Sequence, residues 1–505
     1  MSSVLIDIPG LVDVALRFSR AIVNKIREYA AAHELFQLDL DQTIGFMDQL
    51  SLSLDFVLAI APSLSPHIRR VISDAVSRLN TPLATTQSLL SEAVDSDGKL
   101  RRIWFTVVGK SSLQKSLAAV DKQHDLFLRC LHYSVLFGTA ALQSRATASA
   151  AGGTRALARI SSFREAVAGS QVDARFLLPP ETLPDSAALI RLHSHSDIRI
   201  VALSGGRPAL VEYRDYQPDD PASLRRLRDV ASILSAASPD MSILPCLGFK
   251  PLPATKRCAL VFPVPGTGKP RTLRDLLLAP ENEKGVRHPL NDRIRLAVHL
   301  ATAVLYVHTA RFVHKAICPE NIVVLDHPEL ADSKACFPWT LGSAYLAGFD
   351  FARHEDAASK RAGDNIWWRN LYRHPLRQSS HPETDFSMLH DIYSLGVVLL
   401  EIALWESFVL VGPDGSRTLG RQGRSFAKKG GKMKSPADIR VALLKKAREY
   451  VPLVLGAKYC EVVVMCLDCF DGGLGPTEEL LDGDGVLLGV VFIQRVLAVL
   501  EEITV

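Results

Sequence analysis

The sequence predicts a multidomain protein of the α+β class, in which an all-α helical bundle precedes a bilobal mixed domain with extra C-terminal helices. Between residue 10 and about 143, apolar side chains recur every three to four positions, and no strand-like alternation occurs. Alternation typical of strands begins near residue 198, and long helical patterns return after about 290. A chain of 505 residues also exceeds what one hydrophobic core usually organises.

The composition is that of an ordinary globular protein, with 48% apolar and 22% charged residues. A formal net charge of +4 is small for this length and gives no reason to expect nucleic-acid binding. The N-terminus has neither a basic start nor a long apolar run. The longest uncharged stretch, 131–144, is shorter than the roughly 18–20 residues of a membrane span. We therefore expect a cytoplasmic protein.

The eight cysteines are scattered, which suits a reducing compartment better than a disulfide framework. Their one cluster is Cys460, Cys466 and Cys469, and it lies in an apolar helical pattern. A zinc site needs about four ligands, and no second Cys or His pair accompanies this cluster. We expect buried thiols here and no metal site.

The first helical stretch, residues 10–30, carries Leu11, Val14, Phe18 and Ile22 on one face, while its charged residues fall mostly elsewhere. One interpretation is a helix that buries this stripe inside the bundle. The other is a helix that meets an anionic membrane once it is released. Any bundle helix shows such a stripe, so the pattern alone leaves both open.

Residues 144–186 are rich in small residues, Gly and Pro, and predict a linker or brace. The linker separates a bundle at 1–143 from a second domain at 187–505. Within the second domain we expect an N-terminal lobe at about 187–265 and a C-terminal lobe at about 266–505.

Two alternating runs, 198–203 and 209–214, flank a Gly-Gly-Arg-Pro turn and predict a hairpin. A helix is expected at 222–237 and a further strand at 260–264. A long helix with one apolar stripe should run from about 292 to 308.

The strongest motif is the segment 313–324, with the sequence VHKAICPENIVV. It resembles the catalytic loop of protein kinases, where His-Arg-Asp is followed by an Asn and an apolar strand. Three further segments follow in the kinase order: 346–353 resembles Asp-Phe-Gly, 371–375 the Ala-Pro-Glu anchor, and 391–401 the helix whose Asp buttresses the catalytic loop. Together they predict a kinase-like fold from about 188 to 410.

The residues that carry phosphoryl transfer in that family are replaced. Glu212 takes the place of the third-strand Lys, Ala316 that of the catalytic Asp, and Gly348 that of the metal-binding Asp. A carboxylate facing the triphosphate turns roughly 4 kcal/mol of attraction into repulsion at an effective dielectric near 20. Asn321 and Asp350 remain as candidate nucleotide-binding residues. We therefore predict no catalytic residues, and no use of ATP or Mg²⁺ as cofactors.

Two other segments have some features of ligand-binding sites. The Gly-rich stretch 266–269 lacks the pattern of a phosphate-binding loop, because Pro263 and Pro270 stand where Gly and Ser or Thr are needed. It is better interpreted as a connector between lobes. The basic segment 417–434 is expected to be a solvated insertion, with a membrane surface or an acidic partner as the alternative.

A helical domain followed by a degraded kinase resembles a fungal family that joins a HeLo-type helical domain to a kinase-like half. The opening at 8–11 and the segments 348–350 and 372–375 carry this resemblance. The same layout is similar to that of the necroptosis executioner pseudokinase of animals. The resemblance implies incompatibility cell death, with helix 10–30 as the segment that permeabilises membranes.

These observations predict a catalytically dead pseudokinase that acts as a sensor or scaffold and controls an N-terminal helical effector. Its expected partners are proteins, and activation would bring homo-oligomerisation or peripheral contact of helix 10–30 with membrane lipid. Two alternatives stay open. One is a divergent ATP-dependent kinase that uses Asp350 and Asn321 with Mg²⁺, and the other is an interaction scaffold without membrane activity.

Overall fold

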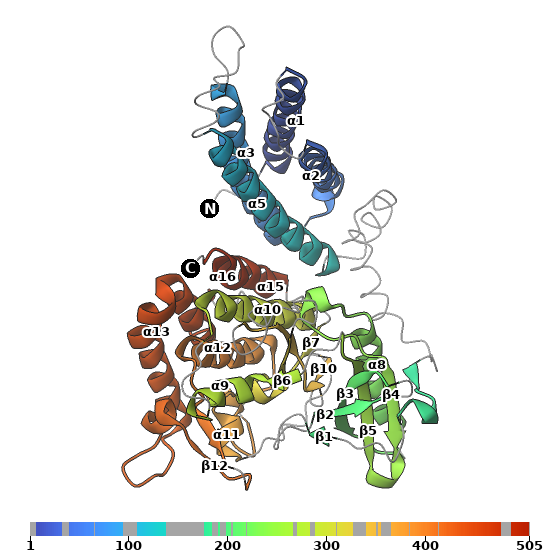
Figure 1. Ribbon diagram of the computed structural model, residues 1–505, viewed down its shortest axis with the longest axis vertical. Helices are drawn as coiled ribbons and strands as arrows, with labels where there is room; N and C mark the ends of the chain where they lie inside the picture. The colour runs from blue at the N-terminus through green and yellow to red at the C-terminus, as the bar shows by residue number, and fades with distance from the viewer. Residues whose placement is uncertain are drawn as a thin grey trace. The chain divides into compact units, whose positions relative to one another are not determined.

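The structure is a computed structural model, shown in Figure 1. It describes residues 7–32, 40–64, 66–93, 109–137, 176–183, 190–191, 198–203, 206–218, 220–265, 270–282, 288–309, 311–326, 340–349, 352–354, 365–382, 384–412, 414–475 and 486–503. Most of the predicted linker at 144–186 lies outside these residues, as do the Gly-rich stretch 266–269 and Asp350.

The contacts divide the chain into two compact units. The first contains Met1–Ser161 with Leu481–Ile493, and the second contains Ser162–Leu480 with Gln494–Val505. The sequence analysis assigned all residues after 187 to the second domain. The short C-terminal stretch is grouped with the first unit because its apolar residues pack against helices of that unit.

The first unit is built of helices, as the periodicity of residues 10–143 predicts. Their bounds are α1 Ile8–Ala32, α2 Leu40–Ile60, α3 Pro66–Glu92, α5 Lys110–Phe137 and α15 Val486–Phe492, with a short 3₁₀ turn η1 at Ala61–Ser63. Helix α1 packs against α2 and α3, α3 packs against α5, and α15 packs against α3 and α5. The unit therefore buries its apolar stripes between neighbouring helices.

Helix α3 runs through Pro82 without ending. The sequence predicts a break or kink at this proline, with a new helix from residue 83. The predicted start of a new helix is wrong. Proline removes one backbone hydrogen bond from a helix interior, but Leu79 and Leu83 on either side of it are fully buried. Their packing holds both halves of the helix in one line.

Helix α1 buries an apolar face, but it is not quite the expected one: Ile22 is buried as predicted, whereas Leu11, Val14 and Phe18 are only half-buried. Val12, Ala15, Ile22 and Ile26 have exposures of 1% or less, while Arg20 and other charged residues are exposed. The Asn80 side chain on α3 also donates a hydrogen bond to the Leu11 carbonyl at 3.2 Å. In this structure α1 is a core helix of its unit.

The second unit begins with a five-stranded antiparallel sheet of order β1-β2-β3-β5-β4. The strands are β1 Ile190–Arg191, β2 Arg199–Ala202, β3 Pro208–Asp215, β4 Gly248–Leu252 and β5 Arg257–Pro263. Strands β2 and β3 form the predicted hairpin, with Ile200 opposite Leu210. Helix α8 (Pro221–Ser235) follows β3 and precedes β4 in the chain. It packs on β4, as Figure 1 shows. The predicted hairpin and the predicted helix at 222–237 are both confirmed.

The remainder of the second unit is mainly helical. Its helices are α9 Leu273–Asn282, α10 Leu290–Thr309, α11 Trp367–Asn370, α12 Met388–Leu404, α13 Pro436–Leu467 and α16 Ala498–Glu501. Its short strands are β6 Pro270–Thr272, β7 Phe312–Val313, β8 Ile322–Leu325, β9 Ser343–Leu346, β10 Arg353–His354, β11 Val409–Val411 and β12 Arg417–Leu419. Helix α12 is buried along almost its whole length and packs against α10 and α13. This buried helix is the centre of the core.

Two helical stretches, Thr43–Ser63 and Pro436–Leu467, are long and apolar enough to cross a membrane by length and composition alone. About half of the most apolar window in each is buried within the protein, as in core helices of soluble proteins. The second stretch is also interrupted, because Gly456 has a φ of +83° inside it. Both features match core helices better than membrane spans.

The cysteine cluster predicted as buried thiols lies at the end of α13. Cys460, Cys466 and Cys469 are free and buried. Burial raises the pKa of Cys466 to about 12, so this sulfur stays a protonated thiol.

Candidate ligand-binding cleft

The loop that the sequence singled out is held by one buried carboxylate. Asp391 on α12 accepts hydrogen bonds from the backbone N–H groups of His314 at 2.7 Å and Lys315 at 2.9 Å. The His308 ring lies 3.2 Å from the same carboxylate. Lys315 adopts a left-handed φ of +68°, a conformation that needs such support in a non-glycine residue. The predicted buttress between segments 391–401 and 313–324 is therefore present.

Glu212 on β3 points at the segment predicted to replace Asp-Phe-Gly. Its two carboxylate oxygens accept hydrogen bonds from the backbone N–H groups of Gly348 at 2.7 Å and Phe349 at 2.8 Å. Two positions farther along the same face of the strand, Arg214 donates to the carbonyls of Phe349 at 2.9 Å and Ala352 at 2.6 Å. Glu212 and Arg214 of strand β3 thus make four hydrogen bonds to the backbone of this segment.

Gly348 and Asn321, two of the singled-out positions, lie in direct contact. Gly348 has a φ of +80°, and a Cβ atom at this position would overlap the Asn321 side chain. Asn321 in turn donates a hydrogen bond from its side-chain nitrogen to the Ala316 carbonyl at 2.8 Å. The structure therefore brings together Glu212, Ala316, Asn321 and Gly348.

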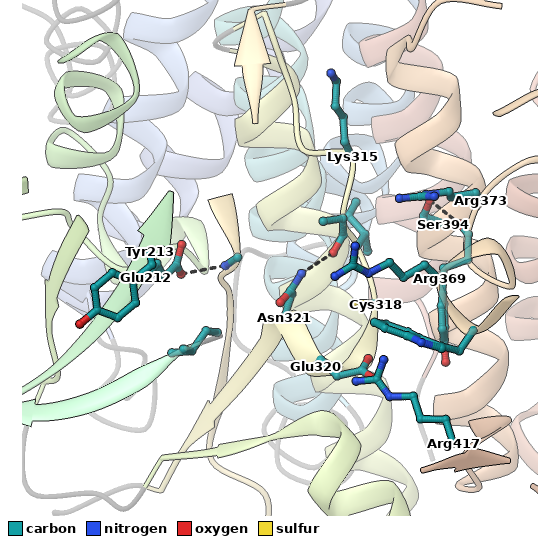
Figure 2. A pocket seen from close by; sticks show the side chains of 16 residues that line it. Glu212, Tyr213, Lys315, Cys318, Glu320, Asn321, Arg369, Arg373, Ser394 and Arg417 are labelled. Atoms are coloured by element: carbon teal, nitrogen blue, oxygen red, sulfur yellow. Dashed lines mark hydrogen bonds between the residues drawn. The ribbon is translucent and has the colours of Figure 1, made fainter. Parts of the chain in front are cut away.

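These residues line an open cleft of about 820 Å³, including solvent at its mouth. Figure 2 shows Glu212 and Tyr213 on one side, and Arg369, Arg373 and Arg417 on the other, with Asn321 between them. The sequence analysis assigned Arg417 to a solvated insertion, but its half-buried guanidinium lines the cleft instead.

A fully buried arginine lies behind the cleft lining and pairs with one of its residues, Glu320. Arg274 on α9 forms ion pairs with Glu320 at 3.1 Å and Glu401 at 3.2 Å, and donates to the Tyr372 hydroxyl at 2.7 Å. Ser407 also accepts a hydrogen bond from it. Burial alone would raise the pKa of Glu320, but the Arg274 guanidinium lowers it below its usual value.

Neither this network nor the arginines that line the cleft were predicted from the sequence. One signal was available, because Arg274 stands before an apolar run and Glu401 lies within one. A charge inside an apolar helical pattern is expected to find a buried partner. No local pattern pairs residues that are 127 positions apart.

Burial sets the protonation of two side chains in and beside the cleft, Cys318 and His314. Burial and the neighbouring Glu320 raise the pKa of the Cys318 thiol well above its usual value, which suppresses the reactive thiolate. Within the described ranges, no group of three or more His, Cys, Asp or Glu side chains is placed to hold a metal ion. Burial also lowers the pKa of His314 to about 4, so this ring is neutral near pH 7.

Comparison with known proteins gives little further. No family model matches the chain, and no curated protein matches it. One similar solved structure is the yeast RNA Pol II CTD kinase CTDK-1 complex, with a TM-score of 0.31 and 14% sequence identity. The match covers 47% of this chain and 68% of that one. At this TM-score the likeness is weak and carries no argument about fold or function.

The buried Glu212 carboxyl should make stability depend on pH. Burial raises its pKa from 4.5 to about 7, although two backbone N–H groups pull it down. The stability contributed by the protonated form is fully present below pH 4.5 and is lost as pH rises through 7. We expect the unfolding free energy of wild type, relative to Glu212→Gln, to fall by up to about 1.4 kcal/mol per pH unit within this window.

Urea unfolding of the full chain between pH 5 and 8 measures this slope. Glu461→Gln, an exposed glutamate on α13, is the matched control and should leave the slope of wild type unchanged. A constant difference between wild type and Glu212→Gln across the range would show that Glu212 does not titrate there.

Removing Arg274 should be strongly destabilising, because Glu320 and Glu401 would remain buried without their partner. We expect Arg274→Met to cost about 3–5 kcal/mol of unfolding free energy. A triple variant that adds Glu320→Gln and Glu401→Gln should recover much of this loss. Arg226→Met removes an exposed ion pair with Asp220 and should cost less than about 1 kcal/mol. Equal losses of unfolding free energy in Arg274→Met and Arg226→Met would contradict the role of Arg274 as the partner of the two buried carboxylates.

Proposed function

We propose that the second unit forms a kinase-like module without phosphoryl-transfer chemistry, which acts as a sensor or scaffold for the N-terminal helical unit. The observation that carries this proposal is the pair of hydrogen bonds from Gly348 and Phe349 to the Glu212 carboxylate. In a kinase, the matching positions supply a Lys for the phosphates and an Asp for Mg²⁺. Here the side chain at the first position, Glu212, accepts the hydrogen bonds that the backbone donates at the second, Gly348 and Phe349.

The order of elements supports a kinase-like assignment. An antiparallel sheet with one helix, α8, precedes the long helix α10. The loop at 313–324 follows α10 and is buttressed by Asp391 on a buried helix. These are the relations that the motif spacing predicts for the family.

Three positions support the proposed absence of transfer chemistry. Glu212 places no cation beside a triphosphate, Ala316 has no group to accept a hydroxyl proton, and Gly348 has no side chain to hold Mg²⁺. The amide of Asn321 is bonded to the Ala316 carbonyl. A divergent kinase that uses Asp350 with Asn321 is the competing proposal.

Nucleotide binding separates these two proposals. We expect no rise in the melting temperature of the full chain with millimolar ATP, with or without Mg²⁺, and no phosphate transfer above a protein-free blank. A ligand at a hundred times its dissociation constant would add about 2.7 kcal/mol of stability, which a thermal shift detects easily. A Mg²⁺-dependent shift together with phosphate transfer, both of which disappear in Asn321→Ala and Asp350→Asn, would establish the divergent kinase instead.

For the first unit, we propose an effector that acts when α1 is released, as in the HeLo-type cell-death family that the sequence resembles. The support is the amphipathic character of α1, whose apolar side chains are buried in its own unit. Each exposed apolar side chain costs about 1.5–3 kcal/mol. A released α1 would therefore need a new apolar surface, such as a membrane or a second copy of the unit.

Loosening the contact of α1 without changing α1 tests this proposal. Leu79→Ala and Leu83→Ala lie in α3, the helix that α1 packs against, and each should cost about 2–5 kcal/mol. We expect these variants of the full chain to increase dye leakage from vesicles that contain anionic lipid. Ser77→Ala, an exposed residue of the same helix, is the control. Folded, loosened variants that cause no leakage would favour a scaffold without membrane activity.

A further inference from the structure

A hairpin rich in lysine leads into helix α13, and it is the orange loop before that helix in Figure 1. The backbone N–H of Lys428 donates a hydrogen bond to the Lys432 carbonyl at 2.8 Å and so pairs the two arms. Gly430 and Gly431 form the turn, with φ angles of +103° and +84° that favour glycine. We call residues 426–434 the basic hairpin.

The positive charge of the basic hairpin is not balanced by neighbouring carboxylates. Residues 424–438 contain five cations and one carboxylate, Asp438, which leaves a formal charge of +4. The three lysines closest to the turn, Lys428, Lys429 and Lys432, are exposed. Among the residues that the structure describes, these three side chains form no ion pair. Their charge is therefore available to an external anionic surface.

An exposed apolar ridge lies on α13, next to its interruption at Gly456. Tyr450, Leu453 and Val454 lie within one helical turn of each other and share one side of the helix. Tyr450 is 44% exposed, Leu453 83% and Val454 38%. Single exposed apolar residues are common on protein surfaces, but three on one side form a patch. We call these three residues the apolar ridge.

Two contacts place the apolar ridge on the side of α13 that meets the root of the basic hairpin. The Lys446 ammonium lies 5.5 Å from the centre of the Tyr450 ring. It also donates a hydrogen bond to the Gln422 side chain at 3.2 Å. Gln422 belongs to the 3₁₀ segment η11 (Arg421–Phe426), which runs directly into the hairpin. The cationic and apolar groups thus belong to one continuous surface.

The carboxylates beside this surface already have cationic partners. Glu406 forms an ion pair with Arg421, and the Glu449 carboxylate lies 3.7 Å from the Lys445 ammonium. These pairs are neutral as units, so they do not offset the charge of the hairpin. The surface as a whole is cationic at the hairpin and apolar at the ridge.

We propose that the basic hairpin and the apolar ridge together dock the second unit onto the surface of an anionic lipid bilayer. Each lysine close to an anionic leaflet strengthens binding about fivefold. The ridge adds a leucine for the boundary of the acyl chains and a tyrosine, which favours the membrane interface. A soluble acidic partner would match the lysines and leave the ridge without a role. This inference is independent of the proposed release of α1.

Flotation of the full chain with lipid vesicles tests the docking. The vesicles contain phosphatidylcholine alone or phosphatidylcholine with about 30% phosphatidylserine. We expect binding only to the anionic vesicles, and binding should weaken when the salt concentration rises. Changing Lys428, Lys429 and Lys432 together to Gln should weaken it about 100-fold. Leu453→Gln should weaken it about 10-fold, because an apolar side chain no longer enters the interface.

Two matched controls lie elsewhere in the second unit. Val441→Gln changes another exposed apolar residue of α13, nine positions before Tyr450 and therefore on the opposite side of the helix. It should bind the anionic vesicles like wild type. A triple Gln variant of three exposed cations removes the same charge far from the hairpin in sequence, and it should also bind like wild type: Arg207, Arg225 and Lys256.

The proposal is overturned if wild type does not bind the anionic vesicles, or if the two triple variants bind them equally well. Tight binding of soluble polyglutamate, together with wild-type vesicle binding by Leu453→Gln, would identify an acidic partner and overturn it as well. Dye leakage reports on the first unit and not on this docking. Docking of wild type without leakage in the loosened α3 variants would sink only the proposed effector, and leakage without docking of wild type would sink only this inference.

Discussion

The buried carboxylate of Asp391 determines the shape of the loop on which one wall of the cleft depends. It satisfies the N–H groups of two consecutive residues, His314 and Lys315, in a place that water does not reach. Lys315 can then keep its left-handed conformation, and the carbonyl of Ala316 faces the Asn321 side chain. Without such an acceptor, these donors would be buried and unpaired, at a cost of about 1–3 kcal/mol each.

On the opposite wall, Glu212 faces the cleft but has a structural role. Glu212 and Arg214 lie on one face of β3 and bind successive N–H and carbonyl groups of the 348–352 segment. A side chain that has all its hydrogen bonds within the protein has little left to offer a nucleotide. On the other side of the cleft, the Arg417 guanidinium carbon lies 3.3 Å from the centre of the Trp368 ring.

Local patterns were sufficient for the hairpin and for the helix stripes, because these are encoded within short stretches. The contact of Asp391 with the loop joins residues 76 and 77 positions apart, and it was expected only from the resemblance to protein kinases. The pairing of Arg274 with Glu401 was not predictable, since it depends on packing between α9 and distant α12. Arg417 was misassigned because a basic, Gly-rich segment looks solvated until Trp368 is placed beside it. The continuation of α3 through Pro82 was missed for a similar reason, because tertiary packing overrides a local preference.

The contact between Gly348 and Asn321 couples the residues that these two positions can hold. A side chain at position 348 would need both a different backbone conformation and a different place for the Asn321 side chain. Asn321 also donates a hydrogen bond to the Ala316 carbonyl. A substitution at Gly348 alone would therefore disturb the 313–324 loop on the other side of the contact.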